Sequence, residues 1–180
     1  NIKRIRPKGL GPFNYLKEAE TSLLWLAEGL TSFMDELFIY RCGLITLEEY
    51  LDLQKDNLLR YYSIKGRRFH SLENSSFNAW NKLYRPDENS TNSSISYYLK
   101  GGIAFFILHT LFIKNENNIN DLLHELWQSY LKNPKEWLET EDVLNMIERI
   151  GNTSIRDKFD LMISTTEELD IIDSFKSIGL

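Results

Sequence analysis

The chain has 180 residues, of which 42% are hydrophobic and 13% aromatic, and this is enough apolar material for one domain with a sizeable core. The formal net charge of −5 at pH 7 argues against a general nucleic-acid-binding protein, because such domains are usually strongly basic. A lone Cys42 cannot form an internal disulfide, so cysteine usage leaves both the cytoplasm and the periplasm open as compartments.

Residues 1–16 are expected to form an irregular basic arm. Four residues that interrupt regular structure fall within it: Pro7, Gly9, Gly11 and Pro12. Lys3, Arg4, Arg6 and Lys8 make this arm basic, and the first acid of the chain is Glu18. No signal peptide opens the sequence, and the absence of a first methionine is what we expect of a piece excised from a longer protein.

Residues 17–43 predict a long helix with one buried face, ending at Gly43. Apolar side chains recur there at steps of three and four residues. At about 100° per residue, Glu28, Thr31 and Asp35 fall along one flank of the apolar stripe. A carboxylate at the edge of a buried face must be paired, hydrogen-bonded or bound to a metal, because removing it from water is costly. The alternative is a solvated acid on the flank of the helix.

A second helix is predicted over residues 47–61. Thr46 and Glu49 form a capping-box signature at its start. The loop over residues 63–71 carries a run of basic side chains that is expected to be a solvated surface. A short helix should follow over residues 75–84.

The strongly apolar segment over residues 95–113 predicts a central buried helix. Gly101 and Gly102 within it allow a neighbouring backbone to approach closely. The longest apolar run, residues 103–113, is shorter than the roughly 20 residues needed to span a bilayer. We therefore expect no membrane partner.

The last third of the chain predicts four more helices, and the sequence has no alternating pattern typical of strands. Their expected ranges are 120–131, 141–150, 154–163 and 170–177, with Asn120, Thr140 and Ser154 as N-caps of the first three. The fold class is therefore predicted to be all-α. Residues 1–180 should form a single helical domain, with the arm at 1–16 and the helical body at 17–180.

No complete metal site can be assembled from the sequence. A catalytic zinc site needs about three protein ligands, and no two of the three histidines are spaced to share a helix face. His109 lies inside the apolar run and is expected to be a core residue. The sequence also contains no Gly-rich phosphate loop, no Gly-x-Ser-x-Gly elbow and no paired cysteines. By motifs alone, the chain is not a self-sufficient enzyme.

A series of short motifs nevertheless resembles one peptidase family. Trp-Leu-Ala-Glu-Gly at residues 25–29 is similar to the gluzincin helix in which a glutamate completes a zinc site begun by an upstream His-Glu-x-x-His helix. In order and spacing, the other motifs resemble the glycyl aminopeptidase family of zinc metallopeptidases, whose members carry a PDZ domain after the catalytic region. These motifs are Asn-Ile-Lys-Arg-Ile-Arg-Pro at 1–7, Leu-Gly-Pro-Phe at 10–13, Gly-Leu-Ile-Thr at 43–46, Ser-Ser-Phe-Asn-Ala-Trp at 75–80, Tyr-Arg-Pro-Asp-Glu-Asn at 84–89 and Ser-Tyr-Tyr-Leu-Lys-Gly at 96–101.

The resemblance implies that the chain is the C-terminal helical half of a thermolysin-like catalytic domain. The sequence departs from the family because the helix that carries two zinc histidines and the general-base glutamate would precede Asn1 and is absent. Zinc is therefore implied for the intact protein, and residues 1–180 alone are expected to lack zinc and to be inactive. The implied partners are a peptide substrate, the missing N-terminal part of the catalytic domain and the following PDZ domain.

The resemblance also implies roles for individual residues. Glu28 would be the third zinc ligand. Tyr98 matches the tyrosine of related aminopeptidases whose phenol hydrogen-bonds the oxyanion of the tetrahedral intermediate, although Tyr97 could hold this role instead. Asp35 and Thr31, on the same flank as Glu28, are candidates to contact a ligand histidine and fix its orientation. The implied reaction is peptide hydrolysis by metal-activated water, with an upstream glutamate as base.

Other functions remain open from the residues themselves. Arg4 and Arg6 could meet a substrate carboxylate, or they could fill the floor of the site in a structural role. A non-enzymatic helical module could bind a protein partner through the basic arm and exposed aromatic side chains. Nucleic-acid binding through the arm is disfavoured by the overall acidity. Without its upstream helix, the surface around Glu28 is expected to expose an apolar groove that self-association could cover.

Overall fold

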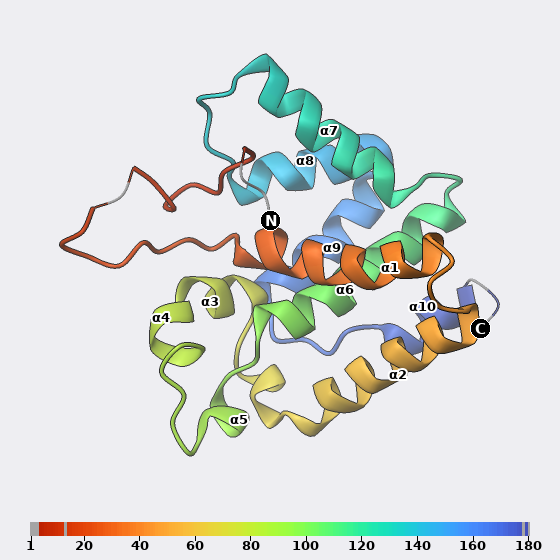
Figure 1. Ribbon diagram of the computed structural model, residues 1–180, viewed down its shortest axis with the longest axis horizontal. Helices are drawn as coiled ribbons and strands as arrows, with labels where there is room; N and C mark the ends of the chain where they lie inside the picture. The colour runs from red at the N-terminus through yellow and green to blue at the C-terminus, as the bar shows by residue number, and fades with distance from the viewer. Residues whose placement is uncertain (1–3, 13, 178, 180) are drawn as a thin grey trace.

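Helix α6, Tyr97–Lys114, runs through the centre of the molecule and contacts most of the other helices (Figure 1). The computed structural model describes residues 4–12, 14–177 and 179. These residues contain no strand, only an isolated bridge between Pro7 and Leu138, so the all-α prediction is confirmed. The other helices are η1 (Trp25–Leu30), α1 (Thr31–Arg41), α2 (Leu47–Ser63), η2 (Lys65–Arg68), α3 (Leu72–Phe77), α4 (Ala79–Lys82), α5 (Ser90–Ser93), α7 (Ile119–Lys132), α8 (Thr140–Ile150), α9 (Thr153–Ser164) and α10 (Ile171–Ser177).

The helices surround α6 because α6 is apolar on nearly all sides. A helix of that kind is stable only when neighbours cover its whole circumference. The continuous rod of η1 and α1 lies along one side of it, and in the view of Figure 1, α7 and α8 lie above and α2 and α10 below. The stretch Ser90–Lys114 is long and apolar enough to cross a membrane by length and composition alone, but 72% of its apolar window is buried inside the molecule.

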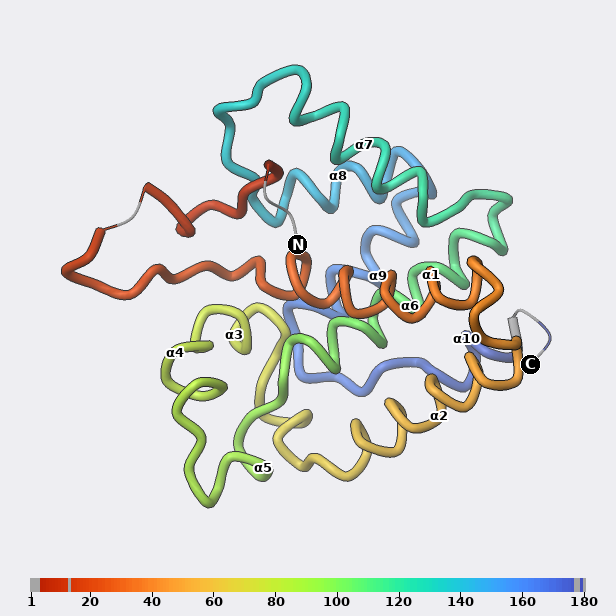
Figure 2. The backbone as a smooth tube through the Cα atoms, viewed as in Figure 1, coloured from red at the N-terminus to blue at the C-terminus, as the bar shows by residue number. Residues whose placement is uncertain are grey.

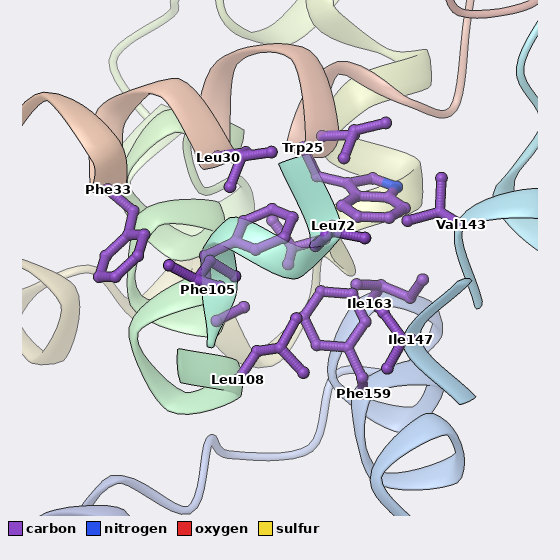
Figure 3. Close-up of a cluster of buried hydrophobic side chains, with 14 of the residues drawn as sticks. Trp25, Leu30, Phe33, Leu72, Phe105, Leu108, Val143, Ile147, Phe159 and Ile163 are labelled. Atoms are coloured by element: carbon purple, nitrogen blue, oxygen red, sulfur yellow. The ribbon is translucent and has the colours of Figure 1, made fainter. Parts of the chain in front are cut away.

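Three aromatic rings from different helices meet at the centre of the core (Figure 3). Trp25 of η1, Phe105 of α6 and Phe159 of α9 are fully buried, and their ring centroids lie 5.3 to 5.9 Å apart. Burying one side chain of this size contributes about 1.5 to 3 kcal/mol. These contacts therefore fix η1 firmly against α6 and α9, and they set the position of the residues that follow Trp25.

Two predicted helix ends are confirmed. The first long helix ends at Arg41 with Cys42 as its C-cap, and Gly43 follows with φ of +71°, a left-handed conformation that glycine adopts without strain. At the start of α2, the Thr46 side chain accepts the Glu49 N–H while the Glu49 carboxylate accepts the Thr46 N–H. This is the reciprocal capping box that the sequence predicts.

The prediction that the first helix starts at residue 17 is wrong. Residues 4–12 run away from α8 and residues 14–23 return to η1 as a non-helical extension of the arm (Figure 2). Residues 14–18 are exposed and bury no apolar face, so nothing stabilises helix there. The helix starts where the Trp25 N–H donates to Ser76 Oγ at 2.9 Å, and the helical body therefore begins about eight residues later than expected.

The three predicted N-caps are also wrong by one or two residues. The observed caps are Asn118, Glu139 and Asn152, and the predicted ones were Asn120, Thr140 and Ser154. In α7 and α8 the cap forms a reciprocal box with an aspartate three residues on, Asp121 or Asp142. Each helix begins directly after its capping asparagine or glutamate, because a side chain at that position can accept the free N–H groups of the first turn.

The basic run after α2 is only partly solvated, contrary to expectation. Arg67 is 7% exposed, and its Nε lies 3.1 Å from the carboxylate of Glu168, which also binds Arg68 at 2.9 Å. Burial would raise the pKa of Glu168, but the hydrogen bonds from Arg68 and Arg67 outweigh it and hold this pKa below its usual value. The ion pairs thus tie η2 to the segment between α9 and α10.

Candidate functional site

The contact between η1 and α6 brings the predicted metal ligand and the predicted tyrosine onto neighbouring backbones. A Cβ atom on Gly29 would lie 2.8 Å from the Cα of Gly101, which is closer than real Cβ atoms come. The two glycines therefore permit a backbone approach that other residues would block, and the predicted close contact of α6 with a neighbour is confirmed. Glu28 directly precedes Gly29, and Tyr98 lies one turn before Gly101.

Glu28 lies in a π-helical turn. Single π-turns are rare and are frequently found at functional sites. Glu28 is half-buried, at the edge of the apolar face that Trp25 and Leu30 bury. The Thr31 hydroxyl lies 3.0 Å from the carbonyl oxygens of both Ala27 and Glu28, so it is engaged by its own helix. Thr31 therefore supports the backbone at Glu28.

The Tyr98 phenol lies in the electrostatic field of Glu28. Burial, followed by the negative charge of Glu28, raises the pKa of Tyr98 to about 12. Tyr98 as a whole is 36% exposed. The structure thus brings together Glu28 and Tyr98, two residues 70 positions apart in the chain.

Tyr97 occupies a different environment from Tyr98. Its side chain is 1% exposed, and its hydroxyl lies 3.3 Å from the hydroxyl of Tyr84. Burial and the hydrogen bond to Tyr84 raise its pKa. Of the two tyrosines that the sequence left open, Tyr98 is therefore the more exposed.

A pocket of about 260 Å³ opens beside Tyr98 between α1, α2 and α6. Asp35 and Glu36 line it from α1, and Arg60 lines it from α2. Glu36 is held in place by the side-chain amides of Gln54, at 2.6 Å, and Asn57, at 2.9 Å. Asp35 is exposed and shares this pocket with Tyr98. The sequence pointed to Asp35, but no periodicity linked the polar residues of α2 to the site.

The basic arm lies elsewhere. The Arg4 guanidinium stacks over Trp127 at 5.9 Å and that of Arg6 over Trp137 at 5.8 Å. Both arginines line a second pocket, of about 210 Å³, against α7 and α8, and neither Glu28 nor Tyr98 lines it. The bridge between Pro7 and Leu138 anchors the arm there. The structure therefore does not bring Arg4 and Arg6 together with the other predicted site residues.

The described part of the chain contains no group of three histidine, cysteine, aspartate or glutamate side chains that could hold a metal ion. His109 is partly buried and packs against Phe33 with ring centroids 5.6 Å apart, and burial lowers its pKa to about 4. Within the described residues its Nδ1 has no hydrogen-bond partner, so it is not the satisfied core histidine that was expected. Because a catalytic zinc needs about three protein ligands, the described residues do not complete a zinc site. Glu28 can supply one carboxylate ligand.

Residues 1–104 match the family profile of M61 glycyl aminopeptidase, which is more than half of the chain. The chain belongs to the M61 family. The match spans η1, α1 and the start of α6, and both Glu28 and Tyr98 fall inside it. No curated protein matches the chain.

The M61 chain also resembles a solved structure along almost its whole length. The crystal structure of an aminopeptidase N family protein from Idiomarina loihiensis superposes with a TM-score of 0.87 at 30% sequence identity. The superposition covers 98% of the M61 chain but only 30% of the Idiomarina protein. The helical arrangement thus recurs as one part of a much larger protein.

Lys100, two residues after Tyr98, is a buried lysine in the core of the M61 chain. Its side chain is fully buried, and within the described residues its Nζ has no hydrogen-bond partner. Burial lowers its pKa to about 8, although the charge of Glu168 acts in the opposite direction. Between pH 8 and about 10.4, the unfolded chain holds a proton on this lysine that the folded chain lacks, so folding stability rises with pH there.

Replacing Lys100 by methionine should therefore stabilise the protein by on the order of 3 kcal/mol at pH 7, because it removes a buried charge. The gain should shrink above pH 8 and vanish near pH 10.5. Urea unfolding at pH 7 and pH 10 measures both values. Lys114→Met, an exposed lysine at the end of α6, is the matched control and should change little. Equal gains at the two pH values would contradict this explanation.

Proposed function

We propose that residues 1–180 form the helical part of the catalytic domain of a zinc-dependent aminopeptidase of the M61 family. In this proposal Glu28 is a zinc ligand, and two histidines of a His-Glu-x-x-His helix outside these residues complete the site. The supporting observation is that the Gly29–Gly101 contact of η1 and α6 brings Glu28 near enough for its charge to raise the pKa of Tyr98, in a chain of this peptidase family. A zinc ion bound there would supply an activated water and polarise the scissile carbonyl.

Tyr98 is proposed to donate a hydrogen bond to the carbonyl oxygen of the substrate as that oxygen becomes negatively charged. A donor must carry its proton at working pH, and the raised pKa of about 12 keeps the phenol protonated. Its partial exposure leaves it accessible to a peptide. One such donor typically accelerates the reaction by about 100- to 1,000-fold.

Asp35 is proposed to orient a ligand histidine by accepting a hydrogen bond from the ring nitrogen that does not bind zinc. It lies two turns from Glu28 on the same helical rod and lines the pocket beside Tyr98. Arg4 and Arg6 take no part in this proposal, because they contact Trp127 and Trp137.

The missing N-terminal part of the catalytic domain is proposed to cover the exposed apolar side chains of the arm and of α3 and α4. Tyr15 and Leu16 are 96% and 95% exposed, and Phe77 and Trp80 are nearly half-exposed. Large exposed apolar groups of this kind mark surfaces that contact another protein segment. Residues 1–180 alone are therefore expected to be inactive and to self-associate. A PDZ domain is proposed to follow them in the intact protein.

The test is hydrolysis of glycyl p-nitroanilide by the full-length protein and by its Tyr98→Phe variant. We expect turnover to fall by about 100-fold in the variant, because the phenol hydrogen bond to the oxyanion is lost, while the zinc content stays unchanged. Tyr62→Phe, on the exposed surface of α2, is the matched control and should retain full activity. A full-length protein without hydrolysis would instead favour a non-catalytic interaction module, and an unaffected Tyr98→Phe variant would remove Tyr98 from the reaction.

A further inference from the structure

Two adjacent serines of α3, Ser75 and Ser76, are buried and bond to the backbone of two other segments. They are 3% and 1% exposed. The Ser76 hydroxyl accepts the Trp25 N–H at 2.9 Å and donates to the carbonyl of Leu72, also at 2.9 Å. The Ser75 hydroxyl donates to the carbonyl of Ile95 at 2.5 Å. One turn of α3 therefore holds both the start of η1 and the segment that leads into α6.

The hydrogen bond to Ser76 caps η1 from another helix. The first N–H groups of a helix have no partner within the helix, and a polar side chain at the N-cap usually accepts one of them. In η1 the N-cap is Leu24, whose side chain makes no such bond. Ser76 accepts the Trp25 N–H instead, from 51 positions further along the chain. Glu28 follows three residues after Trp25 in the same π-helical turn, so this bond sets where that turn begins.

The hydrogen bond from Ser75 fixes the chain just before α6. Ile95 is 4% exposed, and a buried carbonyl that loses its donor is costly. The next residue, Ser96, is the N-cap of α6, and its hydroxyl accepts the Tyr98 N–H at 3.2 Å. The bonds at Ile95 and at Ser96 therefore fix the first turn of α6, from which the Tyr98 side chain projects.

The contact between η1 and α6 needs such an anchor. Gly29 and Gly101 let the two backbones approach closely, but glycines have no side chains that interlock and prevent one helix from sliding along the other. Groups that act together on a substrate must stay within about 0.5 Å of their productive positions. Two directional bonds from neighbouring residues of one helix can fix that relation.

We propose that Ser75 and Ser76 are positioning residues that set where Glu28 and Tyr98 lie relative to each other. Ser76 acts through the start of η1, and Ser75 acts through the start of α6. This inference rests on the proposed function, because it requires Glu28 to bind zinc and Tyr98 to act on the substrate. Neither serine contacts the reacting atoms.

The experiment compares Ser76→Ala and Ser75→Ala in the full-length protein. Ser76→Ala should raise the zinc dissociation constant by about 10-fold, because Glu28 shifts, and should also lower kcat. Ser75→Ala should lower kcat by about 10-fold and leave the zinc dissociation constant within about twofold, because it moves only Tyr98. Titration of zinc against a competing chelator and hydrolysis of glycyl p-nitroanilide at saturating zinc measure the two quantities.

Ser174→Ala is the matched control for a lost buried hydroxyl. Ser174 on α10 is 6% exposed, and its hydroxyl donates to the carbonyl of Asp170 at 2.6 Å. This variant should keep the zinc affinity and kcat of the wild type. If Ser76→Ala does not fold, Ser76→Cys gives the same comparison, because a thiol is similar in size but is a weaker acceptor.

The outcomes separate the inference from the function on which it rests. If both serine variants match Ser174→Ala in zinc affinity and kcat while Glu28→Gln loses its zinc, the positioning roles are overturned and the proposed function stands. If Ser75→Ala and Ser76→Ala weaken zinc binding equally, the two serines do not act on separate residues, and the inference is again wrong. If Glu28→Gln keeps its zinc, the proposed function falls and the inference falls with it.

Discussion

Replacing Glu28 with glutamine in the full-length protein is expected to abolish zinc binding and to lower turnover of a glycyl substrate by at least about 1,000-fold. Removing a partner that merely orients a metal ligand costs about 10- to 100-fold, and a ligand itself should cost more. Glutamine has nearly the same size as glutamate but lacks the charge that a divalent cation requires. The half-buried position of Glu28 on the edge of η1 should tolerate the neutral side chain without loss of folding.

Zinc content by mass spectrometry and hydrolysis of glycyl p-nitroanilide measure the effect of Glu28→Gln. Asp35→Asn is expected to have a smaller effect: turnover should fall by about 10- to 100-fold, and zinc binding should be weakened rather than abolished. Glu48→Gln, at an exposed site in the first turn of α2, is the inert control. Normal zinc content and turnover in Glu28→Gln would show that this carboxylate binds no metal, and the proposed site would have to lie elsewhere.

The second large effect is expected at the contact between Gly29 and Gly101. Gly101→Ala would place its Cβ 2.9 Å from the Cα of Gly29 and 3.3 Å from the carbonyl oxygen of Trp25. Both are backbone atoms that cannot rotate away, so η1 must shift outward from α6. Overpacking of this kind costs about 1 to 3 kcal/mol, and we expect the upper end because both sides are backbone. Turnover should also fall, since Glu28 would move relative to Tyr98.

Gly102→Ala provides a matched control at the adjacent position. Its Cβ would come no closer than 3.7 Å to any neighbour, which is an ordinary van der Waals contact. Alanine is favoured over glycine in a helix by about 1 kcal/mol, so this variant should be neutral or slightly more stable. Urea unfolding of the full-length protein, followed by tryptophan fluorescence, compares the two variants. Equal stability of the two would indicate that the η1–α6 contact is looser than the structure has it.

Much of the fold could be predicted because it follows from local sequence patterns. The apolar run of α6, the capping box at Thr46 and the helix end at Gly43 each follow from a few neighbouring residues. The start of the first helix could not be predicted in the same way, because it depends on Ser76, 51 residues away, accepting the Trp25 N–H. The buried Arg67 was missed for the same reason, since its partner Glu168 lies 101 residues further along.

The candidate site, too, could be predicted from the sequence only where local patterns indicate it. The sequence by itself determined an all-α chain of the M61 family, with an acid at the edge of a buried helix face and tyrosines at the start of the central helix, because periodicity and short motifs are local properties. Only the tertiary structure brought Tyr98 within reach of the charge of Glu28, buried Tyr97 against the Tyr84 hydroxyl, and placed Arg4 and Arg6 against Trp127 and Trp137 of the other pocket. The physical reason is that the packing of Gly29 on Gly101 and of Trp25 against Phe105 sets these distances, and side chains far apart in the chain decide that packing.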